Sequence, residues 1–206
     1  EHHATETIEH GDRNLKNERS NSVDVTLNWA NKGNNFSMTP YFTDFSSYIA
    51  LLDTGVVQFH EHDGESEALP VLLHQNIPAE FYGFEFQGNV PLSSNYGLNY
   101  WGDYVRAKNK NGGDLPRIPP LTLGSGLSYQ WNTLQASIDL EHKFSQSDTA
   151  AGELKTDDFT NLSLTMNYEL PYVKGLNAFI KGDNLLDEEK RSHTSFLKDK
   201  SLMGQR

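Results

Sequence analysis

Hydrophobic and polar residues alternate one by one over most of this chain. The clearest run covers residues 134–140, in which Leu134, Ala136, Ile138 and Leu140 are separated by Gln, Ser and Asp. Successive side chains of a β-strand point to opposite faces of the sheet, so this pattern predicts strands with one apolar and one polar face. Spacings typical of amphipathic helices are hard to find anywhere. We therefore predict an all-β protein, built as an antiparallel up-and-down meander.

The sequence predicts eight strands, and their connections alternate strictly between short and long. The strands are expected near residues 18–31, 35–51, 69–91, 96–108, 120–131, 133–146, 157–170 and 175–186. Short turns fall at 31–34, 93–95, 131–132 and 171–174, and long loops cover 52–68, 109–119, 147–156 and the residues from 187 onward. In a meander, every short turn then lies at one end. This is the layout of an outer-membrane β-barrel, which has short periplasmic turns and longer external loops.

The parity of each strand predicts which side chains face lipid and which face the barrel lumen. A barrel wall that crosses a membrane carries an aliphatic band between two aromatic girdles. Aromatic residues of this chain gather near both ends of the predicted strands, and the apolar face between them is mostly aliphatic. The residues predicted to face lipid are Trp29, Leu123, Leu127, Ile138, Leu164 and Met166, and those predicted to face the lumen are Thr26, Asn28, Thr122, Asp139 and Ser163.

Composition argues against several other classes of protein. The chain has 17 Lys and Arg against 28 Asp and Glu, and this net charge of −11 argues against a nucleic-acid partner. The mean hydropathy is −0.64, and no apolar run approaches the ~20 residues that a transmembrane helix needs. There is no cysteine for a disulfide or a thiolate metal site. A soluble β-sandwich, whose core the aromatic residues would fill, is the alternative fold.

Three motifs in sequence order resemble one known family. Residues 183–189, Asp-Asn-Leu-Leu-Asp-Glu-Glu, are followed by Arg191, His193 and the segment 195–199, and together they resemble the C-terminal signature of TonB-dependent outer-membrane receptors. Residues 115–120, Leu-Pro-Arg-Ile-Pro-Pro, resemble an external segment of that family. Residues 83–88, Gly-Phe-Glu-Phe-Gln-Gly, resemble its Gly-x-Glu strand motif. The opening residues, from His2 to Glu18, resemble the branch that includes zinc-uptake receptors.

The resemblance implies a receptor in the outer membrane of a Gram-negative bacterium, which takes up a metal ion or small metal complex with energy from TonB. Receptors of this family have a 22-stranded barrel and an N-terminal plug domain. Residues 1–206 would then be the C-terminal portion of such a barrel, with the plug domain and the last strand absent. Gly204-Gln205-Arg206 stands where the family has Pro-Gly-Arg. The implied partners are outer-membrane lipid, TonB through the missing N-terminal part, and the metal or metal complex.

Five of the eight histidines fall in two predicted external segments that are rich in carboxylates. Neutral imidazole and carboxylate are ligands that Zn²⁺ takes at about 2.0–2.2 Å. The candidate metal ligands are His60, His62, Glu61, Asp63, His2, His3 and His10. The alternative is a solvated acidic loop in which histidine is incidental. His142 and His193 are interpreted as ordinary polar positions.

The candidate functions are a receptor and transporter, a soluble or secreted all-β binding module, and a barrel enzyme. A Gly-x-Ser-x-Gly nucleophile elbow is absent from the sequence, so catalysis is not expected. No cofactor is expected, and zinc would be a transported substrate. The sequence leaves the substrate open between zinc, haem and a siderophore.

Overall fold

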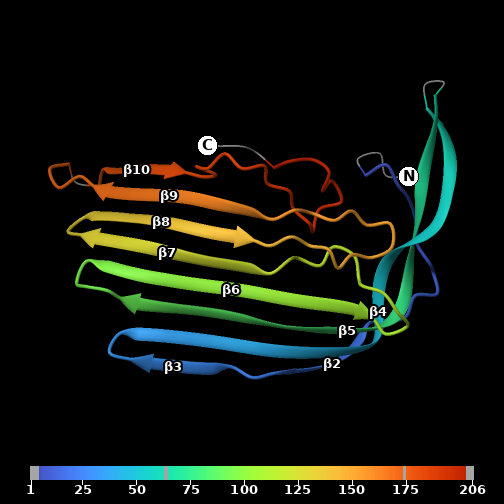
Figure 1. The fold of residues 1–206 in the computed structure, drawn as a ribbon, viewed down its shortest axis with the longest axis horizontal. Helices are drawn as coiled ribbons and strands as arrows, with labels where there is room; N and C mark the ends of the chain where they lie inside the picture. Colours follow the sequence, from blue (N-terminus) through green and yellow to red (C-terminus); the bar gives the residue numbers. More distant parts are fainter. Residues whose placement is uncertain (1–4, 63–64, 174, 203–206) are drawn as a thin grey trace.

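The computed structural model describes residues 5–62, 65–173 and 175–202, and these residues form one ten-stranded sheet (Figure 1). The strands are β1 (Ile8–His10), β2 (Arg19–Asp24), β3 (Leu27–Asn31), β4 (Asn34–His62), β5 (Glu65–Pro91), β6 (Tyr96–Asn109), β7 (Thr122–Trp131), β8 (Leu134–Lys143), β9 (Phe159–Glu169) and β10 (Asn177–Gly182). Their order is β10-β9-β8-β7-β6-β5-β4-β2, with β3 also paired to β4 and β1 to β5. Over the described ranges, no helix is long and apolar enough to cross a membrane.

Neighbouring strands from β4 to β10 are all antiparallel, which confirms the predicted all-β meander. The exception among the described pairs is β1, which runs parallel to β5 opposite Val71–Leu73. The short turns lie together at one end of the sheet and the long connections at the other (Figure 1). The predicted alternation of short and long connections is therefore present, apart from the 52–68 segment discussed below.

The first predicted strand, over residues 18–31, is wrong in one respect, because it is divided into β2 and β3. The division lies opposite Pro40 of β4: Asp24 still pairs with Tyr41, and pairing resumes at Leu27 with Met38. Proline has no N–H to donate, so the ladder loses a hydrogen bond at this point. The backbone N–H of Val25 still donates to the Pro40 carbonyl at 3.2 Å.

The loop predicted at residues 52–68 is also wrong, because β4 and β5 continue through it. They reach 29 and 27 residues, and their pairing extends to His62 opposite Glu65. The register shifts between Phe45 and Tyr48 and again between Asp53 and Val57. Such bulges bend and twist a strand pair, and beyond them the hairpin turns away from the direction of the other strands (Figure 1). The acidic residues of this segment led to the prediction of a loop. A projecting hairpin accepts polar side chains on both of its faces, so its strands lack the alternation of apolar and polar residues.

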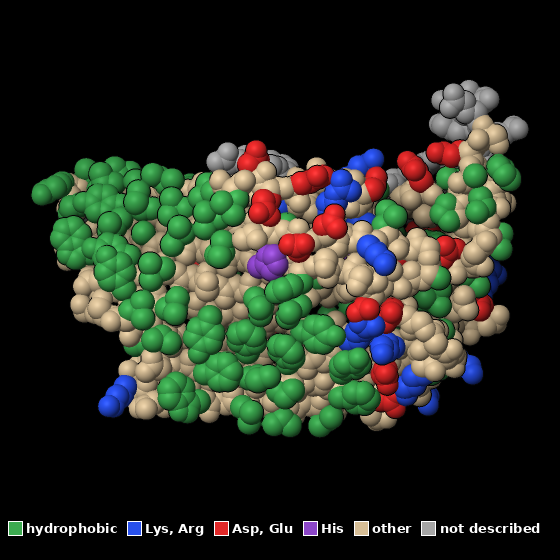
Figure 2. All heavy atoms as spheres, viewed as in Figure 1, with side chains coloured by type: hydrophobic (Ala, Val, Ile, Leu, Met, Phe, Trp, Pro, Cys, Tyr) green, Lys and Arg blue, Asp and Glu red, His purple; other side chains and the backbone are tan. Residues whose placement is uncertain are grey.

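The strand register sorts the two faces of the sheet as predicted. Leu98, Leu127, Ile138 and Leu164 lie opposite one another on four successive strands. The last three are 39%, 43% and 37% exposed, so this apolar row covers a sheet surface and not a closed soluble core. Figure 2 shows this outer face, where hydrophobic side chains cover the half of the molecule nearer the short turns. The register places on this face all six residues predicted to face lipid, and on the opposite face all five predicted to face the lumen.

Two glycines allow large aromatic side chains to lie flat along the sheet. A Cβ on Gly124 of β7 would stand 2.2 Å from the indole of Trp101 on the lumen face. On the outer face, a Cβ on Gly88 of β5 would stand 2.3 Å from the ring of Tyr100. Residues opposite each other on paired strands are close enough that only a missing side chain leaves room for the ring.

The buried core lies at the end of the sheet that carries the long connections. It consists of Ala50, Ile77, Ala79, Ala107 and Leu115, packed against Phe45, Tyr48, Leu52, Phe81 and Ile118. Leu115 and Ile118 come from the β6–β7 connection and cover strand residues of β4, β5 and β6. This packing fixes the loops at this end, where the candidate site lies.

Candidate functional site

Three long segments pack together at the external end of the sheet. They are the β6–β7 loop (residues 110–121), the β8–β9 loop (residues 144–158) and the C-terminal segment (residues 183–202) (Figure 1). In a barrel of this layout, long connections face the outside of the cell. These segments therefore belong to the external end of the chain, as does the projecting β4–β5 hairpin.

The carboxylate of Glu153 joins all three segments. Its Oε1 accepts a hydrogen bond from the backbone N–H of Arg117 at 2.7 Å, and its Oε2 accepts one from Ala150 at 3.0 Å. Lys198 Nζ donates to the same Oε1, and His193 Nε2 lies 3.4 Å from it. The Glu153 side chain is only 6% exposed. A single carboxylate thus connects the β6–β7 loop and the C-terminal segment to its own loop.

The surroundings of Glu153 keep it ionised. Burial alone would raise its pKa, but the interactions with His193, Lys198 and the two backbone amides outweigh burial and lower the pKa to about 2. A carboxylate that accepts several hydrogen bonds beside a cation prefers its charged form. The contact is therefore charged at every pH that a bacterium meets in ordinary growth.

His193 and Lys198 are buried in the same cluster, which we call the Glu153 cluster and which also contains Thr156. His193 Nδ1 lies 3.0 Å from the Thr156 hydroxyl, within hydrogen-bond distance. His193 and Lys198 are 3% and 6% exposed. His193 is therefore a polar position inside a buried network, and its burial was not anticipated from the sequence.

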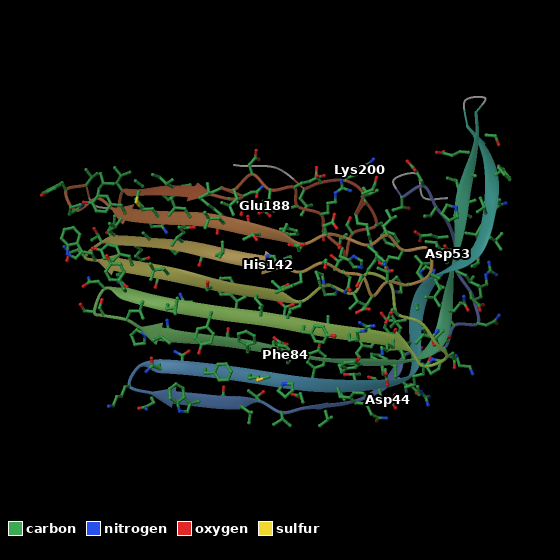
Figure 3. All side chains as sticks on the ribbon, viewed as in Figure 1. Asp44, Asp53, Phe84, His142, Glu188 and Lys200 are labelled. Carbon is green, nitrogen blue, oxygen red and sulfur yellow. The ribbon has the colours of Figure 1, made fainter. Side chains whose placement is uncertain are left out.

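Two further contacts bring the loops together. The Arg117 guanidinium lies 4.0 Å from the ring centroid of Phe196, a cation–π contact between the β6–β7 loop and the C-terminal segment. Gly152, at the tip of the β8–β9 loop, approaches the β4–β5 hairpin so closely that a Cβ there would stand 2.2 Å from Asp53 Oδ2. Asp53 lies where the hairpin bends (Figure 3). All four external segments are thereby in contact.

The Asn-Leu-Leu-Asp motif turns the chain back onto β9 after β10 ends. Asn184 is fully buried; its N–H donates to Asn161 Oδ1 at 3.1 Å and its side-chain amide donates to the Glu188 carbonyl at 3.0 Å. Asn184 and Asp187 both have a φ of 53°, a left-handed conformation that Asn and Asp adopt more readily than most residues. The motif is therefore a structural device that positions the C-terminal segment.

The lumen face below these loops is polar. Glu85 and Asp103 lie directly opposite each other on β5 and β6, in a row continued by Thr39 on one side and Thr122 on the other. A hollow of about 270 Å³ opens beside this pair. It is lined by Ser37, Thr39, Glu85, Phe86, Gln87, Trp101, Gly102 and Asp103. Two neighbouring carboxylates on a lumen wall favour contact with a cationic group.

The predicted metal ligands are spread along the β4–β5 hairpin and the opening segment. Asp63, His2 and His3 lie outside the described residues. His60, Glu61 and His62 continue β4 and pair with Glu67, Ser66 and Glu65 of β5.

His10, at the end of β1, lies opposite Leu73, and its carbonyl oxygen is 3.3 Å from His74 Nδ1. Leu73 lies six positions after Glu67 on β5, which is about 20 Å along a strand. His10 therefore lies far along the hairpin from the His60 position. Among the described residues, no group of three or more His, Asp or Glu side chains is arranged to hold a metal ion. The metal site stays a prediction.

A family profile described as "TonB dependent receptor-like, beta-barrel" matches residues 2–185. Solved structures share the fold at low sequence identity. The copper transporter OprC superposes with a TM-score of 0.73 at 20% identity, covering 89% of this chain and 29% of its own. The siderophore receptor PirA from Acinetobacter baumannii gives 0.68 at 17% identity, covering 96% of this chain and 32% of its own. The FrpB iron transporter from Neisseria meningitidis gives 0.69 at 13%, covering 97% and 31%. The chain thus spans about a third of the length of these proteins.

Proposed function

Because this chain belongs to the TonB-dependent receptor β-barrel family of the Gram-negative outer membrane, we propose that it forms part of the wall of a receptor for metal uptake. The observation that carries the proposal is the two-faced sheet, with an apolar outer surface, a polar lumen surface and external loops packed together at one end. The receptor would bind a metal ion or metal complex outside and import it with energy from TonB. The barrel itself would do no covalent chemistry.

We further propose that residues 1–206 are the C-terminal portion of the barrel. The described sheet ends at β10 on one side and at β2 and β3 on the other. An open sheet edge in hydrocarbon leaves backbone N–H and C=O groups without partners, which lipid does not tolerate. Both edges would therefore pair with other strands of the same receptor. TonB would act through an N-terminal plug that fills the lumen beside Glu85 and Asp103.

Zinc is the substrate that we favour among metals and metal complexes. The support is chemical: His60 and His62 lie two residues apart on an extended strand, with Glu61 between them and Asp63 after them. Histidine with carboxylate suits Zn²⁺ better than Ca²⁺ or Mg²⁺. His2, His3 and His10 would contribute from the opening segment. The similar structures named above are a copper transporter, a siderophore receptor and an iron transporter, so an iron complex or copper is the second candidate.

The alternative, a soluble or secreted binding module without transport, is disfavoured by the outer face. Leu127, Ile138 and Leu164 would expose a continuous apolar row to water. Contiguous apolar surfaces of this kind mark a membrane or protein interface.

Uptake measurements test the proposal directly. The intact receptor, expressed in a Gram-negative host that lacks its own zinc receptors, should restore accumulation of radiolabelled zinc only when TonB is present. Accumulation without TonB would contradict the receptor function. Accumulation of an iron complex or copper in place of zinc would contradict the zinc assignment alone.

The zinc site has its own test by calorimetry on the intact receptor. His60→Ala combined with His62→Ala should weaken zinc binding, and the matched change His142→Ala, on the lipid side of β8, should leave it unchanged. Binding to the unchanged receptor should also weaken as pH falls through ~6.5, because imidazole then takes up a proton. Equal zinc affinity in the double variant would remove this site.

A further inference from the structure

The β4–β5 hairpin projects beyond the rest of the sheet, and β4 has no described neighbour on one side of this hairpin (Figure 1). β2 pairs with β4 only between Tyr41 and Ser47, and the Glu18 carboxylate accepts a hydrogen bond from the Ile49 N–H at 2.8 Å. Beyond Ile49, no described strand pairs with this side of β4, although β4 continues to His62. We call this side of β4, over residues 54–62, the free edge.

The free edge has backbone groups available for a further strand. In an antiparallel pair, only every second residue turns its N–H and C=O toward the neighbouring strand. The remaining residues between Val57 and His62 therefore turn these groups away from β5, along the free edge. The bulge before them differs, because the side chains of Asp53 and Thr54 accept hydrogen bonds from nearby backbone N–H groups. A partner strand would thus pair along residues 57–62.

The sequence of the free edge lacks the residues that usually prevent strand pairing. Many natural edge strands carry lysine, proline or an inward-pointing charge that blocks the addition of another strand. Residues 54–59, Thr-Gly-Val-Val-Gln-Phe, contain no charged residue and no proline. Short segments that combine β-branched and aromatic residues without charge or proline pair readily with other strands. The free edge is therefore suited to pairing with another chain.

A short apolar strip lies on one face of the hairpin beside the free edge. Val57 and Phe59 are two residues apart on a strand and share a face, and they are 53% and 74% exposed. They pair with Pro70 and Ala68 of β5, and these four residues make up the apolar strip. Leu69, on the opposite face, is only 4% exposed. Figure 2 shows hydrophobic side chains on this hairpin, apart from the main outer surface. Side chains of an added strand would cover the strip.

The charge of the hairpin selects the kind of partner. Residues 50–79 contain five carboxylates and neither Lys nor Arg, the carboxylates being Asp53, Glu61, Asp63, Glu65 and Glu67. Like charges on directly opposite residues destabilise a strand pair, so the hairpins of two copies of this chain would repel each other. A basic segment would be attracted instead, because complementary charge steers association and fixes register.

We propose that the free edge binds an extended, basic segment of a peptide or protein outside the cell, which adds to β4 as a further strand. Main-chain hydrogen bonds along residues 57–62 supply affinity, and the apolar strip receives alternate side chains of the partner. Lys or Arg residues between them meet the carboxylates of the hairpin. The inference rests on the proposed placement of this end outside the cell, and it is independent of which metal the receptor imports.

Binding of a synthetic peptide to the intact receptor in detergent tests the proposal. The probe is a peptide of alternating Val and Lys residues, followed by fluorescence anisotropy. It should bind the unchanged receptor, and added salt should weaken binding because the charges of the exposed hairpin are screened. A peptide of alternating Val and Glu should not bind. The Val–Lys peptide with N-methyl groups along one edge lacks the donors for strand pairing and should not bind either.

A variant of the apolar strip locates the bound peptide. Phe59→Ala should weaken binding of the Val–Lys peptide by about tenfold, the change that loss of one covered apolar side chain supports. The matched control is Leu154→Ala in the β8–β9 loop, where the native side chain is 57% exposed, and it should bind as the unchanged receptor does. Hydrogen exchange at the amides of residues 57–62 should slow when the peptide is bound.

Several outcomes would overturn the proposal. These are equal affinity in Phe59→Ala, unchanged exchange at residues 57–62, and equal binding of the N-methylated peptide. Absence of binding to the unchanged receptor would show that the free edge is covered within the receptor itself, which would overturn the proposal as well. Zinc accumulation separates these results from the proposed function, because Phe59→Ala should leave TonB-dependent accumulation unchanged whether or not the peptide binds.

Discussion

At the scale of single residues, Glu153 links more of the external end than any other carboxylate described above. It connects Arg117, Ala150 and Lys198 while being 6% exposed. Glu153→Gln keeps the shape but removes the charge opposite Lys198, and breaking a buried ion pair by removing one partner costs about 3–5 kcal/mol. We expect faster hydrogen exchange at the amides of 117, 150 and 198 in the variant. Glu189→Gln, which removes an exposed pair with Arg191, should change exchange little. Unchanged protection in Glu153→Gln would show that the charge of Glu153 does not hold the loops together.

The same residue predicts the response to acid. The pKa of Glu153 is lowered to about 2 in the folded state, below its ordinary value of 4.5. A depressed pKa contributes stability that is fully present above the unfolded value and is lost as pH falls through the folded one. The loop contacts should therefore persist from pH 7 to about 5 and loosen between pH ~4.5 and 2. Limited proteolysis of the three segments over this range measures the effect, and Glu153→Gln should remove the pH dependence.

At the scale of elements, the sequence reveals strands well where one face is apolar, and fails where the chain projects from the sheet. Residues 134–140 alternate between an apolar and a polar face, and β8 forms there. Residues 52–68 carry carboxylates and belong to the projecting β4–β5 hairpin. Their hydrophobic and polar residues do not alternate as they do in a strand with one apolar face, so the sequence pattern does not indicate a strand. The Glu153 cluster could not be predicted either, because its members come from two segments far apart in the sequence and meet only after folding. The division between β2 and β3 depends on Pro40 of the neighbouring strand β4. The sequence of residues 18–31 alone does not show which residue lies opposite them.

Strand pairing between β6 and β7 depends on the space left at Gly124. Gly124→Ala would place a Cβ 2.2 Å from the Trp101 indole, and the ring would have to leave the sheet surface. Forcing such overpacking costs about 1–3 kcal/mol. We expect a lower unfolding free energy for the intact barrel in detergent and a shifted Trp emission. Gly11→Ala, where nothing lies within 4 Å of the new atom, is the matched control. Equal stability of the two variants would mean that Trp101 is free to move.

For the whole molecule, stability in a bilayer depends on an apolar face toward lipid and a polar face toward the lumen. Leu164 lies in the apolar outer row with Ile138, whereas its neighbour Ser163 lies opposite Asp139 on the lumen face. Arginine on the lipid face near mid-depth costs about 2–4 kcal/mol, and a lumen substitution mainly changes selectivity. In the intact receptor folded into bilayers, Leu164→Arg should lower the unfolding free energy by that amount and Ser163→Arg by much less.

The isolated chain should behave differently from the intact receptor, because both edges of its sheet lack neighbours among the described strands. A bilayer offers no water to satisfy the backbone groups of β10 or β2, so residues 1–206 alone should not insert as a closed pore. Refolding the chain in detergent, followed by gel mobility with and without heating, measures closure. The intact receptor, treated in the same way, should show the heat-dependent shift of a closed barrel. A heat-resistant closed species from residues 1–206 would contradict this prediction. It would mean that β10 pairs with β2 or β3 and that the sheet closes into a small barrel of its own.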